Sequence, residues 1–170
     1  MHIIEKDTYP VRRGNLIVYP EYYTTMSKLH LIQKELTVFD IAVIGVGQHD
    51  SYTKVVIATS GSQYGIRRKI SIFTGEDSKV SPVLEAFDIG DIRLGVIICR
   101  EVLHTAIAEI YRMMGVNLLA VSIGGGDFWG LQRESWIDQM VLFSDIVNAP
   151  LVCACGADKS QGGLNLIIER

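Results

Sequence analysis

The sequence predicts an α/β fold in which strands and helices alternate along one domain. Several apolar runs are rich in β-branched residues and nearly continuous, as is typical of strands buried on both faces. Between some of them, apolar residues recur every three or four positions, which indicates amphipathic helices. The 170 residues contain no repeat or linker, so we assign residues 1–170 to a single domain.

The predicted elements follow each other in a simple order. Strands are expected at residues 16–19, 41–46, 54–59, 92–98, 118–123, 151–155 and 164–168. Helices are expected at residues 25–36, 105–114 and 132–147. Gly115 is placed to end the second helix, and Asn148 with Pro150 to end the third. Residues 52–73 contain consecutive strand patterns, which predicts a hairpin.

Composition excludes several classes of function. Hydrophobic residues make up 48% of the chain, which is typical of a folded globular protein. The 16 basic and 19 acidic residues form no long block of one sign, so we expect neither a nucleic-acid nor a membrane partner. The start of the chain lacks the apolar core of a signal peptide, and the three cysteines do not suggest a disulfide framework. These features predict a cytoplasmic protein.

Three residues carry most of the chemical information. Glu21, Lys69 and Cys99 each stand at the end of a strand-like run. A carboxylate, a cation and a thiol that meet where strands end make a covalent catalyst for acyl transfer. The ordinary interpretation of each is a turn residue, a solvated edge residue and a small core residue, and spacing alone favours that interpretation for Cys99.

Two segments resemble the carbon–nitrogen hydrolase (nitrilase) superfamily. Residues 67–76 are similar to the family's Arg-Lys-x-x-x-Phe-x-Gly-Glu stretch, which carries the catalytic lysine. Residues 87–99 are similar to its Phe-Asp-x-Gly…Gly-Val-x-Ile-Cys stretch, which carries the nucleophile. The family's Pro-Glu is matched at residues 20–21, and later strand segments are matched at residues 115–119 and 162–168.

The resemblance implies a fold and a mechanism. The fold is an α-β-β-α sandwich, in which two sheets pack between helix layers. The activity is hydrolysis of a linear non-peptide carbon–nitrogen bond, in an amide, carbamoyl compound or nitrile, through a cysteine acyl-enzyme. In this mechanism Cys99 attacks, Glu21 acts as the base, and Lys69 holds the oxyanion with the backbone N–H of Arg100. Glu76 matches a second glutamate that helps to position the substrate, and no cofactor is required.

Two aromatic residues are candidates for the substrate pocket. Tyr22 follows the proposed base, and Trp129 lies in a Gly-rich loop; simple packing is the alternative for both. The glycines at 124–126 are not followed by the Lys-Ser/Thr pair of a phosphate-binding loop. The four histidines show no metal-ligand spacing, so we expect no metal.

The chain also departs from the family pattern. Residues 1–14 are too short for the strand and long helix that usually precede the Pro-Glu strand, and the chain stops soon after the strand at 164–168. We therefore expect a truncated form of the fold. Missing strands expose apolar faces and sheet edges, which favours a homo-oligomer or a covering partner. Family subunits commonly pair through their outer helices.

Two alternatives follow from these departures. One is a catalytically inactive relative that binds a ligand or serves as an assembly subunit. The other is a cysteine hydrolase of doubly wound topology with an aspartate as base, against which the Pro-Glu strand speaks.

Overall fold

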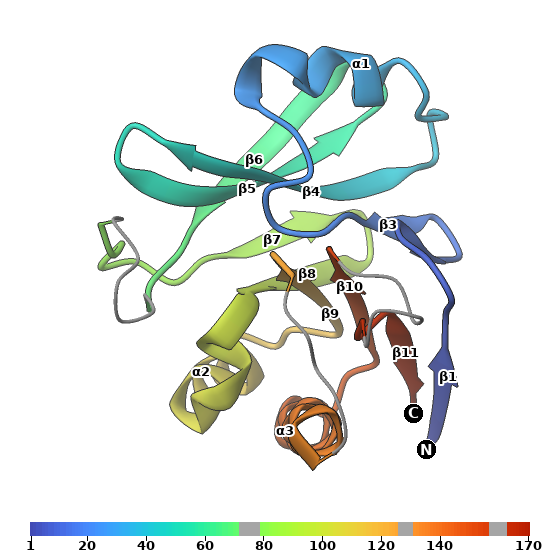
Figure 1. Cartoon of the computed structure of the whole chain (residues 1–170), viewed down its shortest axis with the longest axis vertical. Helices are drawn as coiled ribbons and strands as arrows, with labels where there is room; N and C mark the ends of the chain where they lie inside the picture. The colour runs from blue at the N-terminus through green and yellow to red at the C-terminus, as the bar shows by residue number, and fades with distance from the viewer. Residues whose placement is uncertain (72–78, 126–130, 157–162) are drawn as a thin grey trace.

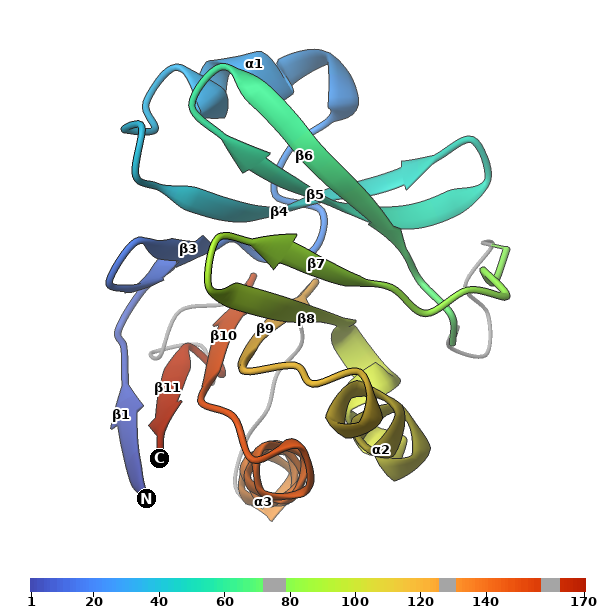
Figure 2. The same cartoon turned by 180° about the vertical axis from the view of Figure 1, so that it is seen from behind.

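A computed structural model describes residues 1–71, 79–125, 131–156 and 163–170. Two β-sheets pack face to face, and helices cover both outer faces (Figure 1). Helix α1 lies over one sheet, while α2 and α3 lie over the other, as the reverse view also shows (Figure 2). The predicted α/β class and the α-β-β-α sandwich are therefore confirmed.

The larger sheet, sheet A, contains six strands in the spatial order β1, β11, β10, β9, β8, β7. Their bounds are β1 His2–Glu5, β7 Ala86–Ile89, β8 Ile92–Ile98, β9 Leu118–Ile123, β10 Leu151–Cys155 and β11 Leu166–Glu169. Strands β8, β9 and β10 run parallel to one another, so their carboxyl ends reach the same edge of the sheet. The outer strands β7, β11 and β1 pair antiparallel.

The smaller sheet, sheet B, contains five strands in sequence order. Their bounds are β2 Val11–Arg13, β3 Leu16–Val18, β4 Ile41–His49, β5 Tyr52–Thr59 and β6 Ser62–Arg68. Strands β3 and β4 are parallel, and the other pairs are antiparallel. The hairpin predicted over residues 52–73 is present as β5 and β6.

The helices agree with the sequence patterns except at the first one. Their bounds are η1 Met26–Lys28, α1 Leu29–Gln33, η2 Cys99–Leu103, α2 Thr105–Met113 and α3 Leu131–Val147. The helix predicted over residues 25–36 is divided into a short 3₁₀ turn and a short α-helix. At its end, Glu35 and Leu36 donate their N–H groups to carbonyls three residues back, which is the tighter 3₁₀ pattern.

The central strands are buried on both faces. On β8, Val96 and Ile98 face sheet B, while Ile97 faces α2 and α3. The same alternation places Cys153 and Cys155 together on the helix side of β10. Because both faces meet apolar neighbours, these strands need no polar positions, which explains their continuous apolar sequence.

The short strands β1, β2 and β7 had no clear sequence signal. The stretch before Gly14 holds β1 and β2 rather than a strand and a long helix. All four residues of β1 are exposed, so its sequence carries no alternation between a buried and an exposed face. Within the described ranges, no helix has the length and apolar character needed to cross a membrane.

Candidate active site

Glu21 lies just after β3, where the chain leaves sheet B and contacts the end of β9 in sheet A. The N–H of Tyr19 still donates to Val43 of β4 at 2.8 Å, whereas the N–H of Glu21 donates to the carbonyl of Ile123, the last residue of β9, at 3.2 Å. The Ser122 hydroxyl adds a buried bond to the Tyr19 carbonyl at 2.9 Å. These contacts hold the Glu21 side chain, which is 2% exposed, at the seam between the sheets.

A glycine on β4 makes room for the segment that contains Glu21. A Cβ on Gly45 would lie 2.1 Å from the carbonyl oxygen of Pro20 and 2.4 Å from the Cα of Glu21. Both distances are far below any normal contact, so only glycine allows the backbone before Glu21 to approach β4 this closely.

Lys69 follows β6 directly and points toward Glu21. Its backbone N–H donates to the carbonyl of Thr53 at 2.9 Å, which continues the pairing with β5. Its Nζ donates to Oε1 of Glu21 at 3.1 Å, and the lysine side chain is 3% exposed. Because water is largely excluded, each charge of this pair acts strongly on groups nearby.

Cys99 begins η2 immediately after β8. Its φ of +54° lies in the left-handed region, which non-glycine residues adopt infrequently and often at functional sites. The backbone N–H groups of Arg100 and Gly124 interact with its thiol. Such a pair of N–H groups at strand ends is the kind of arrangement that stabilises an oxyanion.

The surroundings determine the protonation of this thiol. Burial raises the pKa of Cys99 to about 12, and the Glu21 carboxylate adds to the increase. Lys69 and the two backbone N–H groups act in the opposite direction. The thiol is therefore protonated at neutral pH, and its attack requires a proton acceptor.

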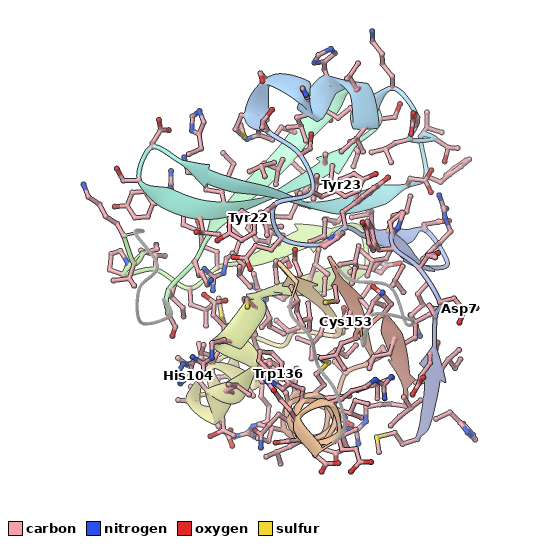
Figure 3. The ribbon with its side chains drawn as sticks, in the orientation of Figure 1. Asp7, Tyr22, Tyr23, His104, Trp136 and Cys153 are labelled. Atoms are coloured by element: carbon pink, nitrogen blue, oxygen red, sulfur yellow. The ribbon has the colours of Figure 1, made fainter. Side chains whose placement is uncertain are left out.

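Tyr22 packs closely beside these groups. It has a φ of +62°, and its side chain is 51% exposed. Its ring is wedged between two glycines, since a Cβ on Gly47 or Gly124 would lie 2.7 Å or 2.8 Å from it. Figure 3 labels Tyr22 and the following Tyr23, which lie on the segment between β3 and η1.

The structure brings together the three residues on which the prediction depended. Glu21, Lys69 and Cys99 converge from strands β3, β6 and β8. Arg100 has an exposed side chain, and it is its backbone N–H that interacts with the thiol. Glu76 and Trp129 lie outside the described residues.

The sequence analysis missed one contributor, Gly124. Its backbone N–H interacts with Cys99, and a Cβ at this position would lie 3.1 Å from Oε2 of Glu21. The available signal was its position after a predicted strand, residues 118–123, that neighbours the strand before Cys99. Parallel neighbours end at the same edge of a sheet, so residues just beyond them meet.

The described parts of the chain contain no cluster of three or more His, Cys, Asp or Glu residues suited to a metal ion. The three cysteines are free, and Cys153 and Cys155 are fully buried.

Several solved carbon–nitrogen hydrolases have the same fold. A CN-hydrolase superfamily protein from Xanthomonas campestris, with an arsenic adduct in its active site, gives a TM-score of 0.71 at 12% identity, over 94% of this chain and 72% of that one. A carbon–nitrogen hydrolase from Helicobacter pylori gives a TM-score of 0.67 at 16% identity, over 89% of this chain and 67% of that one. A variant of the amidase from Nesterenkonia sp. AN1 gives a TM-score of 0.68 at 13% identity, over 89% of this chain and 66% of that one.

A longer protein contains the same fold as one part. The glutamine-dependent NAD+ synthetase from Acinetobacter baumannii gives a TM-score of 0.64 at 13% identity. The match covers 82% of this chain but only 32% of the synthetase. Neither the sequence-family models nor the curated protein sequences give a match to this chain. The likeness therefore shows a shared fold, that of the carbon–nitrogen hydrolases, as the sequence resemblance implied.

Proposed function

We propose that this chain, which has the carbon–nitrogen hydrolase fold, is a cysteine-dependent hydrolase of a linear non-peptide carbon–nitrogen bond. Its substrate would be a small amide, carbamoyl compound or nitrile. One observation carries the proposal: the buried Glu21–Lys69 pair acts on Cys99, whose thiol also meets two backbone N–H groups.

Acylation follows from this arrangement. With an amide, the sulfur of Cys99 forms a bond to the carbonyl carbon while Glu21 takes the thiol proton. The carbonyl oxygen becomes an oxyanion, which Lys69 and the backbone N–H groups of Arg100 and Gly124 stabilise. Glu21 then gives its proton to the nitrogen, the carbon–nitrogen bond breaks, and ammonia or an amine leaves.

Deacylation uses the same groups again, with water as the nucleophile and the thiol as the leaving group. Glu21 takes a proton from a water molecule, whose oxygen forms a bond to the thioester carbon. The carbon–sulfur bond then breaks, the thiol recovers a proton from Glu21, and the carboxylic acid leaves. No redox step occurs, and the net hydrolysis of an amide consumes one water.

The protonation state of the thiol supports a role for Glu21 as the base. With its pKa raised to about 12, Cys99 does not offer a preformed thiolate at neutral pH. A base in the site is then required at the moment of attack, and Glu21 is the carboxylate whose charge acts on the thiol. Lys69 balances the charge of Glu21 and also faces the developing oxyanion.

One of the matched structures suggests a probe. The Nesterenkonia amidase variant carries the acetamide moiety of fluoroacetamide on its active-site cysteine. We would incubate this protein with fluoroacetamide, short amides, carbamoyl compounds and nitriles, and measure intact mass, peptide maps and release of ammonia. We expect an adduct on Cys99 and its loss in Cys99→Ala.

Cys153→Ala is the matched control, because it removes a fully buried thiol in the same sheet, on strand β10, which β9 separates from β8. This variant should keep the adduct and the turnover. A folded parent protein that gives neither adduct nor ammonia with any donor would contradict the proposal. It would favour the alternative of an inactive ligand-binding or assembly subunit.

We also propose a homo-oligomer. Large apolar side chains on the outer helices are exposed, among them Met113 of α2 at 73% and Leu142 of α3 at 41%. Exposed apolar side chains favour association where they form a continuous patch. Sedimentation velocity should show a species larger than a monomer, and Met113→Lys with Leu142→Lys should shift it toward the monomer; a monomeric parent would contradict this proposal.

A further inference from the structure

A second buried ion pair lies beside the candidate active site. Arg67 on β6 donates from Nη2 to Oε2 of Glu101 in η2 at 3.0 Å, and both side chains are 0% exposed. Arg67 precedes Lys69 by two residues, and Glu101 follows Cys99 by two residues. The pair therefore joins the two segments that carry the proposed cation and nucleophile.

The Glu101 carboxylate also binds the backbone of both segments. Its Oε2 accepts the N–H of Ile98 at 2.9 Å, and its Oε1 accepts the N–H of Ile70. Ile98 is the residue before Cys99, and Ile70 is the residue after Lys69. One carboxylate thus fixes the backbone next to each of two proposed catalytic groups.

Stability alone does not account for this arrangement. Replacing a buried ion pair with apolar residues of similar size is often neutral or even stabilising, because two charges no longer lose their hydration. An apolar side chain does not accept hydrogen bonds, however, and would leave the N–H groups of Ile70 and Ile98 without this shared acceptor. The property specific to Glu101 is the link that it makes between the segments.

We propose that Glu101, oriented by Arg67, is a positioning residue that sets Lys69 relative to Cys99. The consequence of this positioning for turnover rests on the proposed function, whereas its effect on the pKa of the Cys99 thiol does not. Lys69 lowers the thiol pKa, so a displaced Lys69 leaves less thiolate at a given pH. A displacement of about 1 Å in a catalytic group costs on the order of 10²-fold in rate.

Glu101→Gln is the first variant. The amide keeps the shape of the side chain, but one of its two terminal atoms becomes a donor. Either the Ile70 N–H, or the Ile98 N–H together with Arg67, then loses its acceptor. The second variant, Arg67→Met with Glu101→Met, removes both charges and so avoids leaving one of them buried without its partner.

Ser71→Ala is the matched control. Ser71 Oγ and His104 Nε2 lie 2.9 Å apart and connect the same two segments, but at the exposed surface. This variant removes a contact between the segments without touching the Glu101 carboxylate. We expect it to behave like the parent protein.

The primary measurement is the rate at which iodoacetamide alkylates Cys99, followed by mass spectrometry over a pH series. Circular dichroism and thermal unfolding verify the fold of each variant. We expect alkylation to slow by about tenfold, as for a rise of one unit in the thiol pKa, in Glu101→Gln and in the double Met variant. Where the parent turns over a substrate, kcat should fall by about 10²-fold with little change in KM.

The outcomes separate this proposal from the proposed function. If the folded double Met variant alkylates at the parent rate, Glu101 does not position Lys69, and the inference is overturned. Should Glu101→Gln fail to fold, the double variant supplies the same comparison, and Arg67→Lys, which retains the cation, should keep the parent rate. A parent without turnover refutes the hydrolase, while the alkylation series still decides the role of Glu101.

Discussion

The two sheets supply different kinds of group to the candidate site. Sheet B provides charged side chains, Glu21 after β3 and Lys69 after β6. Sheet A provides the thiol of Cys99 after β8, together with backbone N–H groups from Arg100 and Gly124. The charges of the site thus depend on particular side chains, whereas its backbone N–H groups depend on how two parallel strands end.

The site consequently exists only when the sheets are packed together. The hydrogen bond from Glu21 to Ile123 and the Arg67–Glu101 pair both cross from sheet B to sheet A. Neither sheet alone brings the Glu21 carboxylate to the thiol. Substitutions in the two halves should therefore have different signatures, and the following predictions test that difference.

The largest effect is expected for Glu21→Gln in the sheet B half. Loss of a general base lowers kcat by about 10²–10⁴-fold. The same change should accelerate alkylation of Cys99, because the Glu21 charge raises the thiol pKa and its removal increases the thiolate fraction. Steady-state kinetics and iodoacetamide labelling measure the two effects, and the exposed Glu35→Gln is the control. Slower alkylation would contradict the assignment.

Lys69→Met should also lower turnover, but it should change the pKa of the Cys99 thiol in the direction opposite to that of Glu21→Gln. Loss of one oxyanion donor costs about 10²–10³-fold in kcat. Because Lys69 lowers the thiol pKa, its removal should slow alkylation. The variant also leaves Glu21 buried without this cation, which costs roughly 3–5 kcal/mol in the free energy of unfolding. Urea unfolding measures that cost, and Lys34→Met, at an exposed lysine, is the control. Equal rates of Cys99 alkylation in Lys69→Met and Glu21→Gln would contradict the opposite effects of the two residues on the thiol pKa.

Gly124→Ala tests the sheet A half, where no charge changes. The added Cβ would lie 2.8 Å from the Tyr22 ring and 3.1 Å from Oε2 of Glu21, so it should displace one or both. We expect a cost of about 1–3 kcal/mol in stability and a lower kcat. Adding Tyr22→Ala removes the contact with the ring and should recover part of the stability. If Gly124→Ala alone matches the parent in both measurements, the close packing at this strand end is not required.

The smallest effect is expected for a surface pair that links the sheets away from the site. Arg13 of β2 makes two hydrogen bonds to Glu169 of β11, at 2.9 Å and 2.8 Å, and the bond lowers the pKa of Glu169. This pair stabilises the fold above the ordinary glutamate pKa, and the contribution is lost as pH falls through the lowered value. Arg13→Met should cost up to about 1 kcal/mol at neutral pH and less in acid, with turnover unchanged. Urea unfolding at neutral and at acidic pH measures this cost. A cost that is larger in acid than at neutral pH would contradict the prediction.

The sequence patterns located the long strands and helices because these elements bury apolar faces against their neighbours. Strands β8, β9 and β10 carry continuous apolar runs since both of their faces are covered, and α2 and α3 present apolar faces to sheet A. Strand β1 was missed because it is exposed on all four residues, and β2 because only one of its three residues, Val11, is buried and the other two are arginines. The short helix α1 was predicted too long because its apolar spacing continues to Leu36 while its hydrogen bonds tighten first.

By itself, the sequence determined that Glu21, Lys69 and Cys99 stand at strand ends and in which order they occur, because hydrophobic periodicity marks where strands stop. Only the tertiary structure decided which atoms meet. Lys69 reaches Glu21 across 48 positions, and Arg67 reaches Glu101 across 34. The Gly124 N–H interacts with the thiol because β8 and β9 end together. Contacts between residues so far apart depend on how the two sheets pack, and local sequence patterns do not encode that packing.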